Sequence, residues 1–98
     1  MGAETFQVTV EAKTAAEAFK VAREDALYNN GHGGYTGSIA EKSKFVTISV
    51  PDGTDPIAYA NGLIDDGDPR IDDKWGPAGC VKVAEGKWHF FGWASSWR

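Results

Sequence analysis

The stretch Lys87-Trp88-His89-Phe90-Phe91-Gly92-Trp93 decides how this 98-residue chain folds. Successive side chains of a β-strand point to opposite faces. Trp88 and Phe90 therefore lie on one face of the expected strand, and Phe91 and Trp93 lie on the other. Because both faces are aromatic, we expect one of them to cover the helices. The other face is either shielded by loops or exposed as a contact surface.

The residues before this stretch predict a hairpin. Residues 79–84 and 87–93 flank Glu85-Gly86, whose length and composition are typical of a two-residue turn between antiparallel strands. We therefore expect the chain to end in two paired strands.

The amino-terminal third predicts a strand followed by a helix. Apolar and polar residues alternate over 5–11, as in a half-buried strand. Thr14 and Glu17 have the spacing of a capping box, and apolar residues recur at helical spacing over 15–28. Asn29-Asn30-Gly31 then supplies residues that commonly end a helix.

The middle of the chain predicts two more strands and a second helix. Residues 35–41 and 45–50 have strand composition and are joined by the polar turn 42–44. Asp55-Pro56 suits the cap and first position of a helix over 56–65.

This order of elements, βαββαββ, predicts a single α+β domain over residues 1–98. We expect a ferredoxin-like split βαβ sandwich with an added carboxyl-terminal strand. In that arrangement both helices lie on one face of a mainly antiparallel sheet.

Composition and charge exclude several classes of function. The formal net charge of −4 argues against binding of duplex DNA, because Lys and Arg supply most of the affinity for phosphates. No apolar stretch approaches the roughly 20 residues of a membrane span, and the amino terminus lacks a signal-peptide pattern. Cys80 is the only cysteine, so no internal disulfide is expected. We expect a cytoplasmic protein that does not bind membranes.

The first candidate binding surface consists of aromatic side chains near the carboxyl end. Trp88, Trp93 and Trp97 are its candidate anchors, and Trp75 is a candidate lid over one face of the final strand. Large aromatic side chains carry much of the energy of protein interfaces.

A cluster of acidic residues follows the second predicted helix. It consists of Asp65, Asp66, Asp68, Asp72 and Asp73. Their spacing does not match a calcium-binding loop, since Arg70 occupies a ligand position. We interpret the cluster as a solvated patch that steers a basic partner toward the protein.

The second candidate site is a glycine-rich loop formed by Gly31, His32, Gly33, Gly34 and Tyr35. Glycines permit close approach of a ligand to the backbone. The loop follows a helix and leads into a strand, which is the reverse of a dinucleotide-binding fingerprint, and it lacks the lysine of a P-loop.

No catalytic residue, metal site or cofactor is predicted. Cys80 lies in a predicted strand, where small buried thiols are inert. One cysteine with His32 and His89 falls short of a zinc ligand set. The residues therefore favour a binding protein over an enzyme.

Two parts of the chain resemble small proteins encoded by bacterial viruses and mobile elements. They are Ala26-Leu27-Tyr28 with the segment from Gly31 to Lys42, and Trp75-Gly76-Pro77-Ala78-Gly79-Cys80 with the segment from Phe90 to Ser96. The resemblance implies a protein that acts in a bacterial host cell. It further implies a stoichiometric inhibitor of a host defence complex, as anti-CRISPR proteins are.

Our leading hypothesis is therefore a non-enzymatic protein that occupies a surface of a larger bacterial protein complex. The alternative is a small-molecule or nucleotide-binding domain, with or without catalysis, built on the His32 loop. A third hypothesis is stacking of single-stranded nucleic acid on Trp88 or Trp93. The sequence is also compatible with a homo-oligomer.

Overall fold

The computed structural model describes residues 2–97. Its elements follow in the order β1 (Gly2–Glu11), α1 (Ala15–Asn30), the short 3₁₀ helix η1 (Ile39–Glu41), β2 (Phe45–Thr47), α2 (Pro56–Asp65), β3 (Ala78–Ala84) and β4 (Lys87–Ser96). The predicted α+β class is confirmed, as is the mainly antiparallel sheet. Within residues 2–97, neither helix combines the length and apolar character needed to cross a membrane.

Both α-helices begin at the predicted caps. The Thr14 hydroxyl accepts a hydrogen bond from the Glu17 amide, and the Asp55 carboxylate accepts one from the Ala58 amide. These side chains satisfy backbone donors that have no partner inside the first turn. Pro56 occupies the first turn of α2, where its missing N–H costs nothing.

The four strands lie in the order β1-β4-β3-β2. β4 is antiparallel to both β1 and β3, whereas β2 is parallel to β3. The prediction of a split βαβ unit was wrong, because the two strands that α2 connects are direct neighbours. β4 is also not an added strand: it lies inside the sheet and pairs with β1 over the whole length of that strand.

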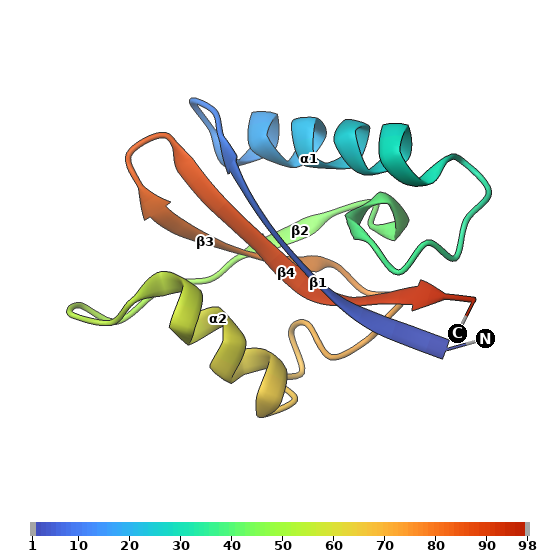
Figure 1. Ribbon diagram of the computed structural model, residues 1–98. Coiled ribbons are helices and arrows are strands. Elements are labelled where there is room, and N and C mark those ends of the chain that lie inside the picture. Colours follow the sequence, from blue (N-terminus) through green and yellow to red (C-terminus); the bar gives the residue numbers. More distant parts are fainter. Residues whose placement is uncertain (1, 98) are drawn as a thin grey trace.

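The helices cover opposite faces of the sheet, so the prediction that both lie on one face was wrong (Figure 1). The connections supply the reason. The chain crosses the sheet from β1 to β2 through α1 and returns from β2 to β3 through α2, in each case joining parallel strands. Such crossovers are almost always right-handed. Two right-handed crossovers that run in opposite directions put their helices on opposite faces.

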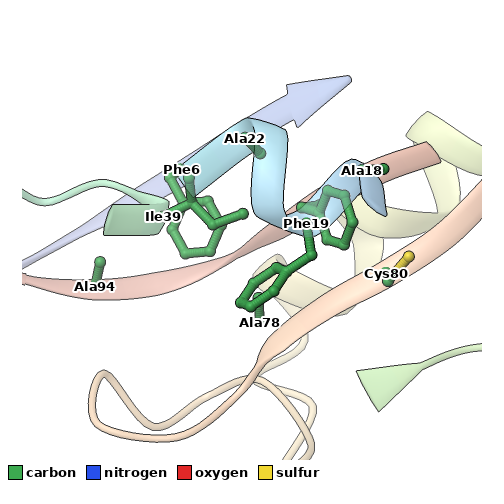
Figure 2. Close-up of a cluster of buried hydrophobic side chains, with 9 residues drawn as sticks. Phe6, Ala18, Phe19, Ala22, Ile39, Ala78, Cys80 and Ala94 are labelled. Atoms are coloured by element: carbon green, nitrogen blue, oxygen red, sulfur yellow. The ribbon is translucent and has the colours of Figure 1, made fainter. Parts of the chain in front are cut away.

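Each face therefore has its own apolar core. Phe90 belongs to the core under α1. Phe6, Phe19 and Ile39 belong to the same core (Figure 2). Phe91 belongs to the core under α2. The two-sided aromatic pattern of β4 is thus explained by helices on both sides.

Residues 35–41 do not form the predicted strand. Thr36 makes a single bridge to Ser96, and η1 follows. Two backbone features end the extended conformation: Gly37 has φ 70°, and the Ser38 side chain accepts a hydrogen bond from the Ala40 amide as the cap of η1. The local hydrogen bond to Ser38 replaces those of a strand.

Candidate functional site

Three aromatic side chains from distant parts of the chain meet at the surface. The ring of Tyr35 lies 4.9 Å from that of Trp97 and 6.3 Å from that of Trp75, measured between centroids. Trp75 is 62% exposed and Trp97 is 71% exposed, whereas Tyr35 is half-buried between them. We call Tyr35, Trp75 and Trp97 the aromatic patch. Contiguous exposed apolar patches on proteins commonly mark interaction sites.

The backbone around Tyr35 is firmly held. The Trp97 amide donates a hydrogen bond to the Tyr35 carbonyl, which ties the glycine-rich loop to the end of β4. The amide and the hydroxyl of Thr36 both donate to the Glu41 carboxylate. Tyr35 itself has φ 55°, a left-handed conformation that is uncommon outside glycine. The loop therefore holds the Tyr35 ring in place at some conformational cost.

Trp75 is positioned by a buried lysine. The Lys42 ammonium donates to the carbonyl oxygens of Asp73, Lys74 and Gly76 at 3.3, 3.1 and 2.9 Å, while the Trp75 amide donates to the Asp73 carboxylate. Lys42 is only 1% exposed. Burial lowers the pKa of Lys42, and the nearby charge of Asp73 opposes this shift. The three carbonyls take the place of water around the ammonium group.

A cavity of about 330 Å³ opens beside the aromatic patch. The residues that line it are Glu4, Asn30, Gly33, Gly34, Tyr35, Thr36 and Trp97. The structure thus brings together part of the predicted glycine-rich loop and one predicted tryptophan anchor. Gly31 and His32 are exposed and do not line this cavity.

The other two predicted anchors lie within the sheet and are half-buried. Trp88 packs at the edge of the core under α1, and its indole N–H donates to the Ala12 carbonyl. Trp93 pairs with Thr5 of β1, and its buried indole N–H has no hydrogen-bond partner within residues 2–97. Neither ring is as accessible as those of Trp75 and Trp97.

The five predicted acidic residues occupy different surroundings. Asp65 ends α2, and Asp66 lines a separate, largely apolar cavity on α2. Asp68 forms a two-point ion pair with Arg70, which lowers the pKa of its carboxyl to about 2 through the hydrogen bonds from Arg70. Asp72 is exposed close to Gly67, and Asp73 lies next to the aromatic patch through Trp75.

Cys80 and His89 are buried in the sheet, in β3 and β4. Burial raises the pKa of the Cys80 thiol to about 11, so this side chain stays protonated at neutral pH. His89 is buried on the α2 face, where Thr9 and Gln7 occupy its two ring nitrogens. Among residues 2–97, no three His, Cys, Asp or Glu side chains are arranged to hold a metal ion.

Several residues of the site carry no recognisable signal in the sequence. Lys42 has the sequence surroundings of an exposed turn, and Thr36 has those of a strand. Tyr35 lies in the loop after α1, Trp75 lies in the loop before β3, and Trp97 follows the end of β4, so the sequence does not indicate that the three rings are close together. In the sequence, only the crowding of tryptophans toward the carboxyl end indicated an aromatic surface.

Comparisons of this chain with protein-family models, with curated proteins and with solved structures found no match.

Proposed function

We propose that this protein is a non-enzymatic binding protein that contacts a larger partner protein through the aromatic patch. The observation that carries the proposal is the grouping of two largely exposed tryptophan rings around the ring of Tyr35. Tryptophan and tyrosine dominate the energetics of protein interfaces, because they bury a large area and lose little side-chain entropy.

The cavity beside the patch favours a partner that inserts a basic side chain. Tyr35 and Trp97 are among the residues that line it. Aromatic faces attract cations. Trp75 already has the Lys74 ammonium 5.4 Å from its ring centroid, so the rings of Tyr35 and Trp97 are the ones offered to the partner.

Charge and backbone geometry support the same proposal. The net charge of −4 and the exposed Asp72 and Asp73 favour encounter with a basic surface. The left-handed conformation of Tyr35 is the kind of local strain that is concentrated at functional sites.

The mode of action that we propose is occupation of a partner's surface. The expected partner, from the resemblance to proteins of bacterial viruses, is a defence complex of a bacterial host, and this identity stays a prediction. A protein of this size acts on such a complex by blocking a surface that the complex needs.

Affinity capture from bacterial lysate tests the proposal. The wild-type chain is compared with Tyr35→Ala and Trp97→Ala, and Tyr28→Ala serves as the matched control because Tyr28 is an 89% exposed ring on α1. We expect a specific partner to be retained by wild type and by Tyr28→Ala and to be lost, by tenfold or more, from the two patch variants. Equal capture by all four proteins would refute the role of the patch.

A second candidate function is the binding of a small polar molecule in the cavity. The volume of about 330 Å³ lies at the lower end of the range for ligand pockets. A ligand that binds only the folded protein raises the melting temperature. A rise caused by nucleotides or sugars in wild type, and lost in Trp97→Ala, would favour this function over the binding of a protein partner.

A further inference from the structure

We propose that two copies of this chain form a symmetric dimer by pairing their β1 strands edge to edge, which joins the two sheets into one. This inference is independent of the aromatic patch. It rests on the backbone of β1, on the residues along its edge and on a groove between β1 and α1.

β1 is a long edge strand that lacks most of the usual protection. It spans ten residues, pairs with β4 on one side, and ends the sheet on the other side. Natural edge strands are commonly shortened, bulged, or marked by Pro or by charged side chains, above all Lys, which prevents pairing with another chain. β1 contains neither Lys nor Pro, its charged residues are Glu4 and Glu11 toward its two ends, and its register with β4 continues without a shift from Gly2 to Glu11.

The hydrogen bonds show which backbone groups of β1 face outward. The Ala12 amide donates to the Gly86 carbonyl, which continues the β1–β4 register by one residue. Hydrogen-bonded pairs alternate along an antiparallel ladder. The even-numbered residues of β1 therefore bond to β4, and the odd-numbered residues direct their N–H and C=O groups away from the sheet. These outward residues are Ala3, Thr5, Gln7, Thr9 and Glu11.

The set of outward residues is symmetric about Gln7. An antiparallel pairing with a second copy, centred on Gln7, matches every outward residue with another: Gln7 with Gln7, Thr5 with Thr9, and Ala3 with Glu11. Each such pair exchanges two backbone hydrogen bonds. A register shifted by one residue would place outward groups opposite inward ones, and a shift by two would leave an outward residue unpaired.

The side chains are compatible with this register. On the face under α1, Phe6 of one copy lies opposite Val8 of the other, and Glu4 lies opposite Val10 of the other. On the opposite face, Thr5 lies opposite Thr9 of the second copy. No charged side chain faces a like charge, and Thr–Thr and aromatic–Val pairs are favourable across strands.

A groove runs along the same edge and supplies further contact area. It has a volume of about 280 Å³ and lies between β1 and α1, with Phe6, Val8, Ala22, Asp25 and Ala26 among its lining residues. Val21 precedes Asp25 by one helical turn and therefore lies on this side of α1. Its side chain is 43% exposed, although it is apolar. In the proposed dimer the two α1 helices lie on the same face of the joined sheet, so this side of each helix faces the other copy.

Sedimentation equilibrium at increasing protein concentration tests the dimer. We expect wild type to reach twice the chain mass of 10.6 kDa. Thr5→Pro removes an outward N–H and adds a ring at the edge, so it should remain a monomer. Proline is tolerated where the N–H of an edge strand faces solvent, so the fold should persist, as checked by circular dichroism. The matched control Thr5→Val keeps the N–H and should still form the dimer.

Amide hydrogen exchange of the wild-type protein supplies a second readout that does not depend on any variant. In a monomer only the even-numbered amides of β1 are protected. In the dimer the amides of Thr5, Gln7 and Thr9 become protected as well, and their protection rises with protein concentration. A wild-type protein that stays monomeric, or a dimer in which these three amides still exchange fast, would overturn the proposal.

Discussion

Phe90 and Phe91 are neighbours in the chain, yet their rings belong to two separate cores on opposite faces of the sheet. Phe90 packs under α1 and Phe91 packs under α2, and neither is accessible to solvent. β4 therefore forms the centre of a three-layer arrangement of helix, sheet and helix.

Removal of either ring should destabilise the protein strongly. Phe90→Ala and Phe91→Ala each leave a cavity in a different core, and we expect each to lower the free energy of unfolding by about 3–5 kcal/mol. Trp97→Ala, at a 71% exposed position, should lower it by less than about 1 kcal/mol. Urea unfolding measures all three. A small effect of Phe91→Ala would show that α2 does not pack on the sheet as described.

Two glycine substitutions should change the stability of the protein in opposite directions. A Cβ atom at Gly79 would lie 2.6 Å from Cζ of Phe91 and 2.8 Å from Cγ2 of Ile71, so Gly79→Ala should cost about 1–3 kcal/mol through overpacking. A Cβ atom at Gly62, inside α2, meets nothing within 4 Å. Gly62→Ala should therefore raise stability by about 0.5–1 kcal/mol, since alanine favours the helix. In thermal unfolding, Gly79→Ala should have a lower melting temperature than wild type, and Gly62→Ala should have a higher one.

Replacement of a buried hydroxyl should stabilise the protein. The Ser95 side chain is fully buried, and its hydroxyl has no hydrogen-bond partner within residues 2–97. An unsatisfied buried hydroxyl costs about 1–3 kcal/mol. We expect Ser95→Ala to raise the free energy of unfolding by up to that amount in urea titrations. A decrease would mean that the hydroxyl is hydrogen-bonded in solution, for example to a water molecule.

Loss of the buried ammonium group should release the loop that carries Trp75. Lys42→Met leaves the carbonyls of Asp73, Lys74 and Gly76 without their donor. We expect a loss of stability of about 1–3 kcal/mol and a change in tryptophan fluorescence as Trp75 moves. Lys44→Met is the control, because Lys44 is exposed. If Lys42→Met binds a partner as wild type does, the position of Trp75 is not needed for the proposed function.

Acid should destabilise the protein through His89. Burial lowers the pKa of His89 below its usual 6.5, so the unfolded chain binds a proton more readily than the folded chain does. The contribution of His89 to the free energy of unfolding is therefore fully present above about pH 6.5, and it is lost as the pH falls from there toward the lower pKa of the folded state. We expect this pH dependence in wild type and its disappearance in His89→Gln. The comparison is made between pH 5 and pH 6.5, roughly the range in which histidine titrates. If the free energy of unfolding changed equally with pH in wild type and in His89→Gln, His89 would not be the group responsible.

Some parts of the candidate site were predictable from residues that lie close together in the sequence. The glycine-rich loop was a candidate because its composition permits unusual backbone angles, and Gly33, Gly34 and Tyr35 line the cavity. Trp97 was a candidate because it is aromatic and near the carboxyl end. Lys42 was missed, because its role depends on the carbonyl groups of a distant segment.

The sequence by itself determined the elements whose stabilising contacts lie within a few residues. Thr14 and Asp55 set the starts of α1 and α2, because a cap and the amide that it binds are three residues apart. Only the tertiary structure decided that the helices lie on opposite faces, that Lys42 is buried, and that Tyr35, Trp75 and Trp97 share one surface. Those features depend on the direction of each crossover and on contacts between segments far apart in the chain. The pattern of residues within a single segment does not specify such contacts.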